Sequence, residues 1–220
     1  MAFGDIVRSK STDDIQGIGG DSSTIWGGYS SQSDYLKEFS TADLSEIKST
    51  SPTISGQVNG IGGSTDVIWY VNQEKVFAEL STSDFSVVRE TTTSNEYEGV
   101  GGSTDVIWTK DSDEMVNEHS PSDFSVLRSN TLNWQPDDFN DTGIGGNKDN
   151  IWTCGYQGRL GEVSTGDLSL IEESSAVDSS GVGIGGDGDT VWHSSDSYIY
   201  ELEPTLDPPN APSNLTTTIK

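Results

Sequence analysis

The sequence predicts an all-β protein, a five-bladed β-propeller of four-stranded antiparallel blades in which the N-terminal strand completes the last blade. Three observations predict this fold: one motif occurs five times, each repeat has the pattern of short strands, and a strand missing at one chain end is present at the other. Repeats of roughly 40 residues are typical of propellers, in which one unit of four strands recurs around an axis.

The repeated motif is Gly-[Ile/Val]-Gly-Gly, with a Trp nine residues after its first Gly, and successive tryptophans lie 43, 39, 44 and 40 residues apart. Innermost strands crowd the axis of a small ring, where Gly permits close backbone approach. A Trp buries a large area and needs only its ring N–H satisfied, so we expect these rings to pack between blades. The motif residues that we expect to be structural are Gly17, Gly60, Gly99, Gly143, Gly183, Trp26, Trp69, Trp108, Trp152 and Trp192.

The remainder of each repeat is clearest in residues 60–99. After the glycines come residues 66–71, 75–80 and 85–89, which are rich in β-branched or aromatic side chains and are bounded by Asn, Ser, Thr or Asp. This is the composition of strands between turns. No helical periodicity occurs, which excludes solenoids made of helix pairs.

The two chain ends predict that the ring is closed. The fifth repeat runs into a proline-rich segment from Pro204 without a fourth strand, and proline cannot donate to a strand ladder. Residues 3–10 resemble residues 85–89, although the alignment leaves Phe3 one residue early, so we expect a bulge or a slip there. An N-terminal strand in the fifth blade would remove exposed sheet edges.

The order of strands in each repeat resembles that of β-propellers built of NHL-type and related repeats, over roughly residues 3–206. The resemblance implies an architecture and carries no activity with it. Residues 207–216 resemble the start of a fibronectin type III module. We therefore expect a propeller domain over residues 1–206, and a proline-rich linker that resembles the start of such a module over residues 207–220.

The charge of the chain is strongly negative. Eleven Lys and Arg residues stand against 36 Asp and Glu residues, a net charge of −25 that is spread over all repeats. Phosphate-backbone binding needs clustered basic residues, so nucleic acid is excluded as a partner. Such acidity resembles that of proteins from extreme halophiles, where salt screens the self-repulsion. No cofactor is predicted; calcium or another cation remains an alternative, although no Asp-x-Asp-x-Asp-Gly motif specifies it.

One loop stands out as a candidate contact site for a ligand or partner. Trp134, Asp137 and Asp138 lie in the longest connection between repeats and have no counterparts in the other copies. An exposed aromatic side chain on a loop is a plausible contact point. The alternative is that Trp134 only packs its loop against the ring.

No pattern of catalytic residues is evident. Cys154 is a lone cysteine two residues after a motif Trp and is expected to be a small buried residue. His119 and His193 occupy non-equivalent positions in different repeats, which gives no support to a histidine site. We therefore expect that the protein is not an enzyme. An enzyme would need unlike acids that converge at the central channel, which the sequence alone does not place.

The function that these observations favour is a virion structural or host-receptor-binding module of a halophilic virus, in a tail fibre, spike or turret. Residues 1–10 lack the apolar core of a secretory signal, and no apolar run is long enough for membrane insertion. The expected partners are other virion proteins, with which the chain would oligomerise, and a host cell-surface glycan or protein. Alternatives are a lectin-like propeller with aromatic platforms, an extracellular or cell-surface adhesin, and, less favoured, a glycosidase-type enzyme.

Overall fold

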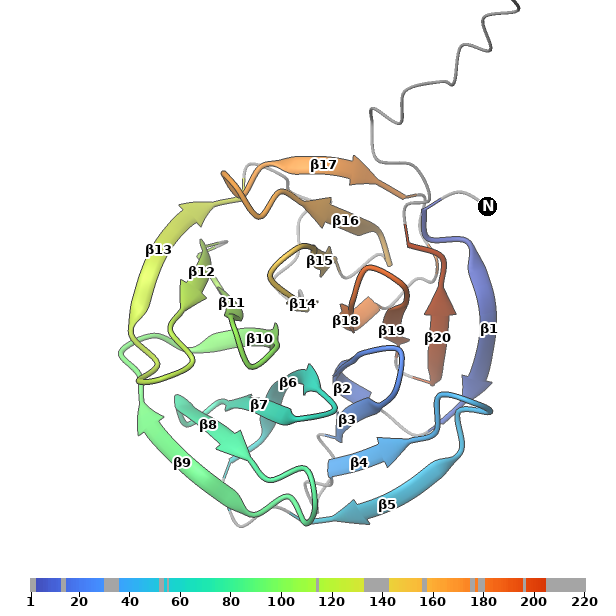
Figure 1. The fold of residues 1–220 in the computed structure, drawn as a ribbon, viewed down its shortest axis with the longest axis horizontal. Coiled ribbons are helices and arrows are strands. Elements are labelled where there is room, and N and C mark those ends of the chain that lie inside the picture. The colour runs from blue at the N-terminus through green and yellow to red at the C-terminus, as the bar shows by residue number, and fades with distance from the viewer. Residues whose placement is uncertain are drawn as a thin grey trace, which may run out of the picture.

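The computed structural model describes residues 3–12, 15–29, 36–51, 54, 56–113, 115–132, 143–155, 158–174, 177, 181–195 and 197–204. Their strands form five four-stranded antiparallel sheets, arranged around a central axis as the blades of a propeller (Figure 1). The all-β fold predicted from the repeats is confirmed. None of the described residues forms a helix, so none of them supplies a helix that could cross a membrane.

Each blade runs from an innermost strand at the axis to an outermost strand at the rim (Figure 1). Blade 1 contains β2 (Ile15–Gly20), β3 (Ile25–Tyr29), β4 (Leu36–Phe39) and β5 (Glu46–Thr50). Blade 2 contains β6 (Val58–Ser64), β7 (Val67–Asn72), β8 (Val76–Leu80) and β9 (Val87–Thr92). Blade 3 contains β10 (Tyr97–Gly102), β11 (Ile107–Asp111), β12 (Met115–His119) and β13 (Val126–Thr131).

The last two blades include the closure of the ring. Blade 4 contains β14 (Ile144–Gly146), β15 (Ile151–Cys154), β16 (Leu160–Val163) and β17 (Leu170–Glu173). Blade 5 contains β18 (Gly181–Gly186), β19 (Val191–Ser195), β20 (Tyr198–Leu202) and β1 (Ile6–Ser11). The antiparallel pairing of β1 with β20 confirms that the N-terminal strand completes the fifth blade.

Of the expected bulge or slip, β1 has a bulge, but it lies between Ile6 and Arg8 and not at Phe3, where Gly4 takes the place of Phe85. The N–H of Gly4 donates to the Glu203 carbonyl, as the N–H of Phe85 donates to the Ser81 carbonyl. Both residues have positive φ, 80° at Gly4 and 59° at Phe85, a conformation that Gly adopts without strain. The aromatic ring therefore comes from the preceding residue, and β1 keeps the register of the other outermost strands, including their shared bulge.

The motif glycines bring the innermost strands into backbone contact. A Cβ atom added at Gly19 would lie 2.5 Å from the Cα of Gly62 in the next blade, and one at Gly17 would lie 2.7 Å from the Ile61 nitrogen. Any side chain at these positions would push the blades apart. The expectation that Gly is needed for close approach at the axis is confirmed.

The motif tryptophans are buried between blades, as expected, with at most 2% of each residue exposed. Four of the indole N–H groups donate to a backbone carbonyl in the first turn of the next blade, at 2.9 to 3.1 Å. These donors and acceptors are Trp26 with Ser64, Trp69 with Ser103, Trp108 with Asn147, and Trp192 with Asp21. Each of these four rings thus joins two blades by apolar burial and by one directed bond.

Candidate functional site

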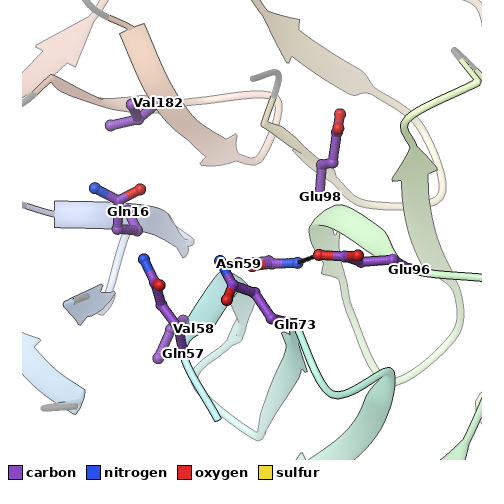
Figure 2. A pocket seen from close by; sticks show the side chains of 8 residues that line it. All are labelled: Gln16, Gln57, Val58, Asn59, Gln73, Glu96, Glu98 and Val182. Atoms are coloured by element: carbon purple, nitrogen blue, oxygen red, sulfur yellow. Dashed lines mark hydrogen bonds between the residues drawn. The ribbon is translucent and has the colours of Figure 1, made fainter. Parts of the chain in front are cut away.

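A pocket of about 310 Å³ lies on the face of the ring where the innermost strands begin, around the entrance of the central channel (Figure 2). Blades 1, 2, 3 and 5 contribute to it, and most of its lining comes from blades 2 and 3. The lining residues are Gln16, Gln57, Val58, Asn59, Gln73, Glu96, Glu98 and Val182.

A second and much smaller cavity adjoins the pocket at the axis. Its volume is about 10 Å³, and the first glycines of the motif and the Ile or Val residues after them line it together with Gln16, Asn59, Glu98 and Val182 of the pocket. This is roughly the space that one water molecule needs. The glycine backbones of neighbouring blades lie close together here, so the innermost strands leave little room between them.

In blades 1, 2, 3 and 5, the residue before the first glycine of the motif lines the pocket. These residues are Gln16, Asn59, Glu98 and Val182. The ladder between the innermost strand and the next strand has a bulge at this position, for example between Tyr97 and Gly99. A bulge re-aims a side chain, so the repeated backbone presents unlike side chains at one entrance.

The walls of the pocket are rich in hydrogen-bonding groups. The Asn59 amide donates to a Glu96 carboxylate oxygen at 3.1 Å, the dashed line in Figure 2, and to the Tyr97 carbonyl at 3.0 Å. Glu98 lies across the entrance from Gln16, and no lysine or arginine is among the described residues that line the pocket. The lining therefore combines amides and carboxylates and favours a neutral or cationic ligand.

A buried cation lies beside this acidic wall. The Lys110 ammonium nitrogen is 3.9 Å from a Glu98 carboxylate oxygen, an ion-pair distance that is too long for a hydrogen bond. Only 1% of the Lys110 side chain and 17% of the Glu98 side chain are exposed. Buried lysines are rare unless they are paired, so this pair marks blade 3 as unlike the others.

The candidate contact residues of the long loop, Trp134, Asp137 and Asp138, lie outside the described residues. Cys154 is fully buried, and burial raises the pKa of its thiol to about 12, which leaves no thiolate for nucleophilic attack at ordinary pH. Burial also lowers the pKa of His119, whose ring contacts the Thr109 hydroxyl and the Phe124 carbonyl. Neither residue belongs to the pocket.

A metal centre has no obvious ligands in the described part of the chain, where no group of three or more His, Cys, Asp or Glu side chains could hold an ion. The turn aspartates accept hydrogen bonds from their own turns instead, as Asp84 does from the hydroxyl and the N–H of Ser86. These recurring acids shape the turns.

The residues of the pocket were not singled out from the sequence, although a signal for them exists. The motif is constant from Gly onward, whereas the residue before it changes from Gln16 to Asn59, Glu98 and Val182. The second residue after the motif Trp is likewise charged only in Lys110. Positions that vary inside a constant repeat indicate where a symmetric ring acquires a single site.

The fold and the pocket define a five-bladed propeller with one asymmetric polar site at its axis. No family model matches the sequence, and no curated protein matches it. A glutaminyl cyclase from Myxococcus xanthus has a similar structure, with a TM-score of 0.73, 11% identity, and coverage of 94% of this chain and 100% of that chain. The β-propeller domain of Cps50 (Swd1) from Myceliophteria thermophila has a TM-score of 0.56 and 8% identity, over 92% and 100% of the two chains. At these identities the likeness shows the fold alone.

The expectation that the protein is not an enzyme is contradicted by the likeness to the cyclase. That expectation rested on a lone cysteine, on two histidines at non-equivalent positions, and on acids that the sequence alone does not place at the channel. The alignment covers 94% of this chain and the whole of the cyclase chain, so the two rings are similar in size. A ring of this size can therefore carry an active site. The structure also brings Glu96 and Glu98, acids of a single blade, to the channel entrance.

Proposed function

We propose that the protein recognises a small polar ligand with a positively charged amine, in the pocket at the entrance of its central channel. The observation that carries the proposal is a pocket of about 310 Å³ lined by amides and two carboxylates, with no basic side chain among its described lining residues. Glu96 and Glu98 would attract the amine, and Gln16 and Asn59 would bond to hydroxyl or amide groups of the ligand.

The expected role in a virion supplies one setting for such recognition. The ligand would then be an amine-bearing glycan or peptide of the host surface, and a particle that carries many rings would multiply weak single contacts. The pocket, and not the loop with Trp134, is the contact in this proposal. The virion, its other proteins and the halophilic host stay predictions from the sequence, as do the NHL-type and fibronectin-like resemblances.

A second candidate function is cyclisation of an amino-terminal glutamine, favoured by the position of Glu98 and by the likeness to a glutaminyl cyclase. In this reaction the α-amine attacks the side-chain amide carbon, the new C–N bond closes a ring, and the bond to the amide nitrogen breaks. One proton leaves the attacking nitrogen, one reaches the departing nitrogen, and ammonia is released. Glu98 would act first as the general base that takes the proton from the attacking nitrogen. It would then act as the general acid that gives a proton to the departing nitrogen.

One experiment tests both functions. Ligand-observed NMR would compare glucosamine with glucose, and glutaminylglycine would be followed for binding and for ammonia release, in dilute and in molar potassium chloride. We expect glucosamine to bind and glucose not to bind. Glu98→Gln should weaken amine binding by roughly tenfold or more, since a hydrogen bond to a charged group contributes about 1.5–3 kcal/mol. The matched control is Glu90→Gln, which removes the same charge from exposed β9 and should change nothing.

The outcomes separate the two candidates. Ammonia release that is lost in Glu98→Gln would establish the cyclase. Binding without ammonia release would leave recognition alone. If neither amine binds to the unaltered chain, or if Glu98→Gln binds as well as the unaltered chain does, the proposed site is wrong.

A further inference from the structure

We infer that Lys110 is a positioning residue for the site: its buried ammonium group keeps the Glu98 carboxylate ionised at the channel entrance and so determines where an amine ligand docks. The part of this inference that concerns the ligand rests on the proposed function. The ion pair itself does not, because it joins two residues whose distance and burial the structure gives directly.

The first argument comes from the repeat. Lys110 is the second residue after a motif Trp, a position on the strand next to the innermost one that is buried in every blade. The equivalent residues carry no charge: they are Gly28, Val71, Cys154 and Ser194. Glu98 is likewise the only acid among the described residues that precede the first motif Gly. The two exceptions occur in the same blade, on the paired strands β10 and β11.

The second argument is energetic. An ammonium group with 1% exposure has lost nearly all of its hydration, which costs several kcal/mol unless a partner compensates for it. Replacement of a buried ion pair by apolar groups of similar shape is often neutral or stabilising. Blades 2 and 4 carry Val71 and Cys154 at this position and are equally well buried. Stability alone therefore does not explain a lysine at this position. The need to keep a carboxylate charged at the pocket does explain it.

The charged neighbours of the pair support this assignment. Glu96 lies in the same pocket, and Asp111 follows Lys110 and accepts a hydrogen bond from the Asn95 amide. The charge of Lys110 acts on the Cys154 thiol of β15, but burial has the larger effect and raises the pKa of this thiol, which stays protonated. The residues at the entrance from the other described blades, Gln16, Asn59 and Val182, do not titrate. Lys110 is thus the cation placed to balance Glu98.

The first test needs no ligand. Carbon-13 NMR of the glutamate carboxyl groups would follow Glu98 as a function of pH, with its signal assigned by comparison with Glu98→Gln. In the unaltered chain we expect this signal to keep its ionised position to lower pH than in Lys110→Met. Lys110→Met preserves the length of the side chain, and thermal unfolding would verify that the ring still forms. Identical titrations in the two proteins would overturn the inference.

The second test separates a positioning role from a merely structural ion pair. Glucosamine binding would be measured from about pH 8 to about pH 5 in the unaltered chain, in Lys110→Met and in Ser194→Ala. Ser194 holds the equivalent buried position in blade 5 and serves as the uncharged control. Toward pH 5, Lys110→Met should lose glucosamine binding at a higher pH than the unaltered chain does, because a Glu98 carboxyl without its cation takes up a proton sooner and a neutral carboxyl no longer attracts the amine. Ser194→Ala should follow the unaltered chain.

The possible failures are distinguishable. Suppose that the Glu98 titration shifts in Lys110→Met, but that glucosamine binding falls at the same pH in both proteins. The ion pair is then structural, and the positioning role is wrong. If the unaltered chain binds neither glucosamine nor glutaminylglycine, the proposed function and the positioning role both fall, and the NMR titration still decides whether Lys110 holds Glu98 ionised.

Discussion

The boundary between blades 2 and 3 and the boundary between blades 4 and 5 are built from the same repeat, yet they are held together differently. At the first, Arg89 pairs with Glu79 at 2.6 Å and donates to the Pro121 and Ser122 carbonyls of the next blade. Similar links made by Arg8, Lys48 and Arg128 occur at three other boundaries. These cations join the outer parts of adjacent blades.

At the boundary between blades 4 and 5 the equivalent residue is Glu172, which lies opposite Glu162 in the β16–β17 register. The indole N–H of Trp152 has no hydrogen-bond partner among the described residues, unlike those of the other motif tryptophans. Phe3 instead stacks on Trp152 with ring centroids 5.4 Å apart. The difference teaches that the boundary between blades 4 and 5 depends on apolar stacking. The β1–β20 ladder inside blade 5 holds the segment that carries Phe3 in place.

Removal of the stacked ring should have the largest effect on this boundary. Phe3→Ala should lower the free energy of unfolding by about 3 kcal/mol, because it leaves a cavity against Trp152. Denaturant unfolding would give the free energy, and hydrogen exchange would show whether β1 and β20 open first. Equal exchange across all blades would show that this boundary is no weaker than the others.

Loss of the cation at the other boundary should cost less. Arg89→Met should lower stability by about 2 kcal/mol, since it leaves the Glu79 carboxylate and two carbonyls without their donor while part of the pair is open to solvent. The loss should be smaller in molar salt, which screens the charges. An Arg89→Met protein as stable as the unaltered chain would mean that these cations do not hold the blades together.

The two tryptophans provide a matched pair of substitutions. Trp69→Phe removes a hydrogen bond of 3.1 Å to the Ser103 carbonyl, whereas Trp152→Phe removes an N–H that has no partner in the described part of the chain. The first should therefore cost about 1 kcal/mol more than the second. Equal costs in denaturant unfolding would contradict the difference that we describe.

The boundary between blades 4 and 5 can also be strengthened. Glu172→Arg would replace two opposed carboxylates by an ion pair with Glu162, and we expect a gain of about 0.5–1 kcal/mol. Ile171→Arg, a change on the exposed neighbouring residue, is the control and should give no such gain. A loss of stability in Glu172→Arg would show that Glu172 makes a contact that the repeat does not predict.

The smallest effect concerns pH. Bonds from the hydroxyl and the N–H of Ser45 lower the pKa of Asp43 to about 2, below its value in an unfolded chain. Its contribution to stability is therefore complete above about pH 4 and is lost as the pH falls toward 2. Asp43→Asn should flatten the acid side of the stability curve. Phe3 occupies the position in blade 5 that Asp43 occupies in blade 1, so the boundary between blades 4 and 5 has no carboxylate at this position.

Most of the fold was predictable because each repeat is locally consistent. The motif glycines, the buried tryptophans and the N-terminal strand were all assigned from spacing and strand pattern, and the structure confirms them. The bulge or slip was expected at Phe3, whereas the bulge of β1 lies between Ile6 and Arg8. A linear alignment matches side chains, but Gly4 matches the backbone conformation of Phe85. The site was missed, since its residues lie far apart in sequence and differ from blade to blade.

The sequence by itself determined the number of blades, the composition of each and the closure of the ring, because these depend on local periodicity and on hydrogen bonds between consecutive strands. Only the tertiary structure decided that Gln16, Asn59, Glu98 and Val182 share one pocket, and that Lys110 lies beside Glu98. The physical reason is that closure converts positions about 40 residues apart into neighbours around one axis. There the identity of each side chain, and not the repeat, determines the chemistry.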